Sequence, residues 1–213
     1  MNVVLPRVRV PSQPRAVRTR ALLLDAAARE FSLRGYAATT SKSIADRAGV
    51  ATGSFYQYFA SKDVLLRELS ATRLAAIAQR SLALLDQPSA SAQMHSASVE
   101  QVRDRLAAVV ALVTELHREN PALHAVMTER RHADAELDAI WSIGERALVE
   151  RIAGLLERWG WADDPLARAF VLFGMVEGSV HAHVLGRPMV SDERFTAALV
   201  DALLSIVRPA PPR

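Results

Sequence analysis

The chain has 213 residues, half of which are apolar, and its richness in Ala and Leu favours helices. It has no cysteine, which excludes disulfides and thiolate metal sites and suits a reducing cytoplasm. The net charge of +3 is uneven, because residues 1–62 hold ten Lys or Arg against three acids, a net +7, and the remainder carries −4. A basic head on a mildly acidic body indicates a polyanionic partner such as nucleic acid, or else only a solvated surface with a basic tail.

The N-terminal half is predicted to begin with a disordered basic arm over residues 1–14, which contain three prolines and two arginines. A first helix follows over residues 15–34, with Leu23, Ala27 and Phe31 on one face and Gly35 placed to end it. Thr40 precedes a short helix over 41–48, and another covers 52–59. A long helix then starts at Ser61 and runs through Leu85.

The second half is predicted to continue as helices, after a Ser- and Ala-rich loop over 87–97. A capping box opens a helix over 98–118, and two cap-plus-proline signals, Asn120-Pro121 and Asp164-Pro165, begin helices over 121–131 and 165–186. The others span 134–160 and 191–207, and residues 209–213 form a tail. We therefore predict an all-α protein of nine helices. No secretory signal is expected, and no membrane span either, since the most apolar window contains Glu177, His181 and His183.

Residues 41–59 have the spacing of a helix-turn-helix. Two short helices that cross steeply need a small residue where they touch, which Ala45 supplies, and a turn residue that accepts positive φ, which Gly49 supplies. Val50 or Phe55 then pins the second helix to the first. The second helix carries Thr, Ser, Gln and Tyr side chains and no acid, as an approach to phosphates requires. Since Tyr56 and Tyr58 are two residues apart on a helix, at least one is expected to be exposed, whereas Phe59 is expected in the core.

The motifs from Phe31-x-x-x-Gly35-Tyr36 through Ile44-Ala45-x-x-Ala48-Gly49-Val50 to Gly53-x-Phe55-Tyr56-x-Tyr58-Phe59-x-Ser61-Lys62 closely resemble the N-terminal domain of the TetR/AcrR repressors. The resemblance covers residues 18–69 and implies a helix-turn-helix domain over 15–62 and an effector-binding and dimerisation domain over 63–208. It also implies a set of DNA contacts: Ser41, Lys42, Thr52, Gly53, Ser54, Tyr56, Tyr58 and Lys62. Two departures are Ala51 in place of a capping serine, so that Thr52 becomes a candidate cap, and Glu30 in place of a leucine, which suggests an altered packing edge.

The resemblance further implies a homodimer whose last two helices pack on those of the partner. Gly174, Gly178, Ala182 and Gly186 recur every four residues, a smooth ridge that a second helix could approach closely. Apolar residues flank this ridge or lie on the last helix, and they pack either on the partner or within the protomer: Phe170, Phe173, Val176, Val180, Phe195, Leu199, Ala202, Leu203 and Ile206.

Members of such a family hold a small-molecule effector among the C-terminal helices. The candidate lining residues are His117, Met127, Trp141, Phe173, Glu177 and His181, although each also fits ordinary core or surface. We expect no metal site and no cofactor, because His181 and His183 point to opposite sides of one helix and a helix break separates His117 from His124. No phosphate loop, nucleophile elbow or paired-carboxylate motif indicates catalysis.

The sequence therefore predicts a ligand-responsive dimeric repressor that binds a palindromic operator in double-stranded DNA. The alternative is a helical ligand-binding or adaptor protein whose basic head contacts something other than DNA. An enzyme is the remaining hypothesis. A steep fall of affinity with salt, with preference for one palindrome, distinguishes the first hypothesis from the second.

Overall fold

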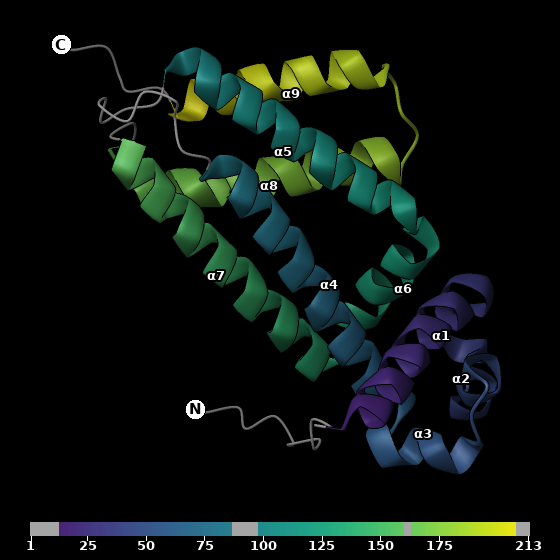
Figure 1. The fold of residues 1–213 in the computed structure, drawn as a ribbon. Coiled ribbons are helices and arrows are strands. Elements are labelled where there is room, and N and C mark those ends of the chain that lie inside the picture. Colours follow the sequence, from purple (N-terminus) through teal and green to yellow (C-terminus); the bar gives the residue numbers. More distant parts are fainter. Residues whose placement is uncertain (1–12, 87–97, 160–162, 208–213) are drawn as a thin grey trace. The chain divides into compact units, whose positions relative to one another are not determined.

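The computed structural model describes residues 13–86, 98–159 and 163–207, and these residues form α-helices and no strand (Figure 1). The nine helices of this part of the chain agree with the expected number. Their bounds are α1 Pro14–Ala38, α2 Ser41–Ala48, α3 Thr52–Tyr58, α4 Lys62–Leu85, α5 Val99–Glu119, α6 Pro121–Arg131, α7 Ala135–Trp159, α8 Pro165–Val184 and α9 Asp192–Val207. The expected arm, the loop over 87–97 and the tail lie largely or wholly outside the described residues.

Local capping explains most helix boundaries. The Asn120 side chain accepts a hydrogen bond from the Leu123 amide at 3.0 Å, and that of Asp164 accepts one from the Ala167 amide at 3.1 Å, so both cap-plus-proline predictions are confirmed. Ser98 and Gln101 form the expected reciprocal capping box. Gly35 has φ 70° and ψ 175°, a conformation open almost only to glycine, and breaks the helical backbone of α1 as predicted.

The chain divides into two compact units, and it crosses between them within α4, between α5 and α6, and within α7. The first unit contains residues up to 73 together with 120–141, and the second contains 74–119 together with 142–213. Residues 120–141 belong to the first unit because α6 packs on α1.

In the first unit, α1 packs against α2 and α6, and α2 packs against α3. Its fully buried side chains include Leu23, Phe31, Ile44, Phe55 and Leu65. Polar contacts attach α6 and the start of α7 to the N-terminal helices. The Ser32 hydroxyl lies 2.9 Å from Asn120 Oδ1, the Arg130 guanidinium lies 4.0 Å from the centre of the Tyr36 ring, and Arg67 makes two 2.9 Å hydrogen bonds to Asp134.

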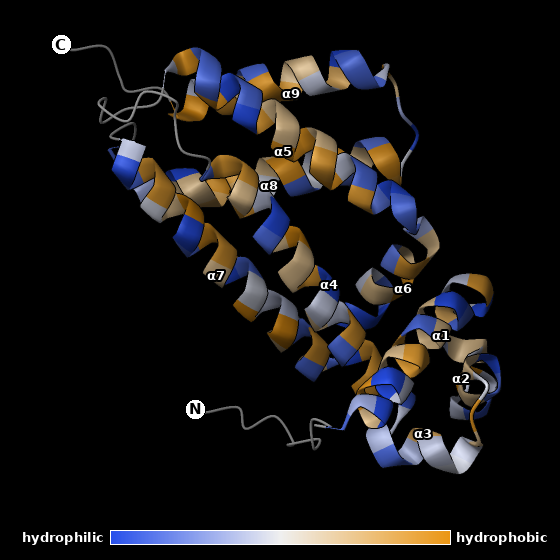
Figure 2. Ribbon diagram, in the orientation of Figure 1, coloured by the Kyte–Doolittle hydropathy of each residue, from blue (hydrophilic) through white to orange (hydrophobic). Residues whose placement is uncertain are grey.

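In the second unit, α5, α8 and α9 pack against one another around an apolar core. Hydrophobic and hydrophilic residues alternate along α5, so this helix presents one apolar face to that core (Figure 2). Val180, Leu199 and Leu203 are buried inside the protomer, at 0%, 6% and 1% exposure, so they are core residues and not part of a surface for a partner. Among the described residues, no helix combines the length and hydropathy that crossing a bilayer requires.

Candidate nucleic-acid interface and effector cavity

The turn between α2 and α3 is fixed by its local sequence. Thr40 and Ser43 form a capping box at the start of α2, with hydrogen bonds of 3.0 and 3.1 Å. At the other end Gly49 has φ 69° and ψ 30°, and the Val50 amide donates to the Ala45 carbonyl at 3.0 Å. This is the left-handed glycine turn predicted for Gly49, and it sets the direction in which α3 leaves α2.

Side chains on the inner faces of both helices hold α3 against α2. Ile44, Ala45, Phe55 and Phe59 are fully buried, and the rings of Phe55 and Phe59 lie 5.8 Å apart. The prediction that Phe59 belongs to the core is thus confirmed. Because these inner contacts fix the orientation of a helix of only seven residues, they also determine which side chains α3 presents to solvent.

The outer face of α3, formed by Gly53, Tyr56 and Gln57, is exposed, and the Tyr56 side chain leaves 58% of its surface to solvent. The expectation that one of the two tyrosines is exposed is confirmed, while Tyr58 is half-buried. Ala51 occupies the N-cap position without a side-chain hydrogen bond, so Thr52 does not act as the cap. The outer face therefore offers hydroxyl and amide groups with no acidic side chain on α3.

The other predicted DNA contacts also belong to the first unit. Lys42 is exposed, and partial exposure describes the rest of the set: Ser41, Thr52, Ser54 and Lys62.

Lys62 has a stabilising role that its position in the sequence did not indicate. Its ammonium donates to the carbonyls of Tyr36 and Thr39, each at 2.8 Å, and lies 4.1 Å from the centre of the Tyr36 ring. The side chain thus ties the start of α4 to the end of α1, which leaves one of its three N–H groups for a phosphate.

Glu30 is a buried carboxylate within the first unit, and it accounts for the departure noted in the sequence. It accepts a hydrogen bond from Arg47 Nε at 2.6 Å and pairs with Arg34 at 3.4 Å. Burial raises the pKa of Glu30, but the hydrogen bonds from Arg47 and Ser43 and the positive charges of Arg34 and Arg47 lower it by more. The pKa of Glu30 therefore lies below its usual value. Glu30 therefore links α1 to α2 as an ion.

The second unit contains a cavity of about 70 Å³ whose lining is almost entirely apolar. The polar residues in its wall are Ser81 and Glu177; the Ser81 hydroxyl is buried and has no hydrogen-bond partner among the described residues. Sequence reasoning missed Ser81, although Ile77, Ser81 and Leu85 follow one another at four-residue intervals on α4. The complete lining is Ile77, Ser81, Leu85, Leu106, Val109, Val113, Leu148, Ile152, Leu172, Phe173, Val176, Glu177 and Leu203.

The six effector candidates separate into three groups. Phe173 and Glu177 line the cavity. His117 and His181 belong to the same unit, with their Nε2 atoms 3.1 Å apart, and His181 lies 3.4 Å from a carboxylate oxygen of Glu177. Met127 and Trp141 are buried in the first unit.

Comparisons with known proteins find two family models that match this chain. "Bacterial regulatory proteins, tetR family" matches residues 23–69, and "Tetracyclin repressor-like, C-terminal domain" matches residues 101–205. The HTH-type transcriptional repressor KstR2 of Mycolicibacterium smegmatis is 36% identical over 112 residues, which are 51% of this chain and 54% of that protein. The match thus spans about half the length of this relative.

Solved structures share the fold over most of its length. The fatty acid degradation regulator FadR from Bacillus halodurans has a TM-score of 0.70 and 19% identity, with 94% of this chain and 100% of that chain covered. The flavonoid-responsive regulator FrrA has a TM-score of 0.66 and 26% identity, with 90% of this chain and 95% of that chain covered.

Proposed function

Since the chain belongs to the TetR family of bacterial regulatory proteins, we propose that it is a ligand-responsive transcriptional repressor that binds operator DNA as a homodimer. The observation that carries this proposal is the outer face of α3, which is exposed, free of acids and held in a fixed orientation by the buried Phe55 and Phe59. In this role the protein is a cytoplasmic regulator and not an enzyme.

In the proposed complex, α3 enters the major groove. Tyr56 and Gln57 then reach base edges or phosphates, while the exposed Gly53 lets the backbone come close to the DNA. Lys42 supplies a positive charge to a phosphate from the neighbouring helix. The remaining proposed contacts are Ser41, Thr52, Ser54, Tyr58 and the third N–H group of Lys62.

The proposed dimer forms through α8. Gly174, Gly178, Ala182 and Gly186 are exposed in the protomer, as is the neighbouring Phe170, whose side chain leaves 68% of its surface to solvent. An exposed aromatic beside a row of small residues permits close approach of a second helix. A two-fold dimer then presents two copies of α3 and requires a near-palindromic operator.

The proposed effector is a mainly apolar small molecule with a polar group that reaches Ser81 or Glu177. The cavity of about 70 Å³ is smaller than the engineered cavity of about 150 Å³ that holds benzene, so that a larger effector must displace the lining helices. Ile77, Ser81 and Leu85 belong to α4, whose first half carries the buried Leu65 and Leu66 of the first unit. Displacement of α4 by the effector therefore disturbs the DNA-binding unit, which supports release of the operator.

A Tyr56→Ala variant tests the proposed interface. We expect it to weaken binding of a selected operator duplex at least tenfold in fluorescence anisotropy, with thermal stability unchanged because the side chain is exposed. The control is Leu33→Ala, which removes a similarly exposed side chain from α1. Unchanged affinity in Tyr56→Ala contradicts the proposed interface, and failure of the unaltered protein to bind any duplex favours an adaptor whose basic head has another partner.

A further inference from the structure

His117 is a buried histidine on α5 whose tautomer is set by the backbone carbonyl one helical turn earlier. Its Nδ1 lies 2.7 Å from the Val113 carbonyl oxygen, and the residue is only 2% exposed. Since a carbonyl oxygen can only accept, Nδ1 carries the proton, and in the neutral ring Nε2 then bears a lone pair. A backbone carbonyl that orients the ring in this way is the usual outer partner of a metal-binding histidine.

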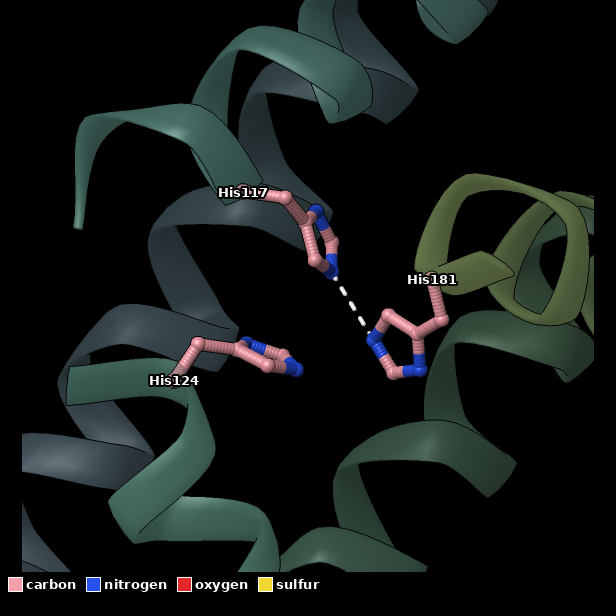
Figure 3. A group of neighbouring side chains, drawn as sticks. All are labelled: His117, His124 and His181. Atoms are coloured by element: carbon pink, nitrogen blue, oxygen red, sulfur yellow. Dashed lines mark hydrogen bonds between the residues drawn. The ribbon is translucent and has the colours of Figure 1, made fainter. Parts of the chain in front are cut away.

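His181 on α8 lies directly opposite this lone pair. Figure 3 shows the two rings, from helices far apart in the sequence, turned toward one another. Their Nε2 atoms lie 3.1 Å apart. One helical turn earlier on α8, Glu177 places a carboxylate oxygen 3.4 Å from the same nitrogen of His181. The Nε2 atom of His181 thus lies within 3.4 Å of a second imidazole nitrogen and of a carboxylate oxygen, all within the second unit. His124, also labelled in Figure 3, belongs to the first unit.

We propose that His117, His181 and Glu177 form a binding site for a divalent transition-metal ion such as Zn²⁺. Zinc binds histidine nitrogens at about 2.0–2.1 Å, so two nitrogens 3.1 Å apart subtend about 100° at the ion, between octahedral and tetrahedral geometry. Imidazole nitrogen with carboxylate oxygen is a donor set suited to zinc, nickel and iron, whereas calcium and magnesium prefer oxygen alone.

In the metal-free protein the two rings share a hydrogen bond, in which Nε2–H of His181 donates to Nε2 of His117. Metal binding requires the proton of His181 to move from Nε2 to Nδ1, with rotation of the ring so that both lone pairs point to the ion. This tautomer change releases no proton.

Three protein ligands leave at least one coordination position for water or another ligand. Because Glu177 also lines the apolar cavity, the ion lies beside that cavity, and an oxygen atom of an effector can occupy the open position. This last step rests on the proposed function, whereas binding of the ion does not. Spacing along the chain could not predict this site, because His117 and His181 are 64 residues apart and meet only where α5 packs on α8.

The test is metal binding by the full chain after removal of metal with a chelator. Calorimetric titration with Zn²⁺ is expected to give one site per chain, and Co²⁺ is expected to give visible absorption bands. Substitutions His181→Gln and Glu177→Gln are each expected to weaken Zn²⁺ binding at least tenfold and to diminish the Co²⁺ bands. The matched control is His132→Gln, which removes an exposed histidine of the first unit and is expected to change neither signal.

Two results overturn the proposal: no saturable binding of either ion, or equal affinity in the unaltered chain and in both site variants. Two variants are used so that poor folding of one, seen as a lowered thermal midpoint, leaves the other to decide. The titration contains no DNA, so a negative result leaves the proposed repressor function standing. Conversely, failure to bind operator does not change the expected metal titration.

Discussion

Gly53 provides a way to separate folding from DNA binding. It is the second residue of α3, and a methyl group added there would meet no atom within 4 Å apart from its chain neighbours and the backbone of its own helix. Glycine in a helix costs about 0.5–1 kcal/mol relative to alanine, and a position in the first turn feels the lower part of this range. Gly53→Ala is therefore expected to stabilise the protein by about 0.5 kcal/mol, or about 1–2 °C in thermal midpoint for a chain of this size.

Binding is expected to change in the opposite direction. If the backbone at Gly53 approaches a phosphate, the added methyl group separates the two, and we expect operator affinity to fall at least tenfold, about 1.4 kcal/mol. Thermal unfolding and fluorescence anisotropy with the same operator duplex measure the two effects. Gly49→Ala is the matched comparison, because φ of 69° at Gly49 makes a side chain unfavourable. The free energy of unfolding of this variant should decrease by about 1 kcal/mol. A Gly53→Ala protein that binds operator as tightly as the unaltered one refutes the reasoning.

Three further predictions follow from individual contacts. Lys62→Met keeps the apolar stem but loses both carbonyl hydrogen bonds, so the free energy of unfolding in urea should drop by about 1–3 kcal/mol. The control Lys42→Met, at an exposed lysine, should change it by less than about 0.5 kcal/mol. Equal values for the two variants rule out the stabilising role of Lys62. Phe170→Asp should raise the dissociation constant of the dimer at least tenfold, as measured by light scattering. The control Ile143→Asp, at a similarly exposed position, should leave it unchanged. A dimer unaffected by Phe170→Asp places the interface elsewhere. Burial raises the pKa of Asp134, but its hydrogen bonds with Arg67 and with backbone amides lower it more. The ionised Asp134 therefore stabilises the protein near neutral pH, and this contribution is lost as the pH falls below about 4. Asp134→Asn should unfold more easily at pH 7 and lose less stability on acidification, and parallel acid-unfolding curves of the two proteins contradict this.

Much of the fold follows from local signals that the sequence states directly. Asn120-Pro121 and Asp164-Pro165 mark helix starts because the cap and the proline act within one turn, and Gly49 marks the turn because few other residues accept its backbone angles. The exposed position of Tyr56 also follows from helical periodicity once Phe55 and Phe59 are assigned to the core.

Contacts between distant segments could not be predicted in this way. Periodicity indicates that a face is apolar but not which helix covers it, so Leu199 and Leu203 were candidates for the partner surface although they pack inside the protomer. In the same way, no local signal indicates that the Lys62 ammonium contacts two carbonyls more than 20 residues earlier. The pairing of His117 with His181 depends on how α5 and α8 pack, which no spacing along one helix reveals.

The central claim is that the exposed face of α3 reads DNA. Its most direct test is to select duplexes from a random library with the full chain and to measure affinity for the enriched duplex between about 50 and 200 mM salt. A near-palindromic sequence is expected to be enriched, and its affinity should fall about a thousandfold or more over this range, since both heads of a dimer contact phosphates. Absence of any enriched sequence, together with an affinity independent of salt, would contradict the claim.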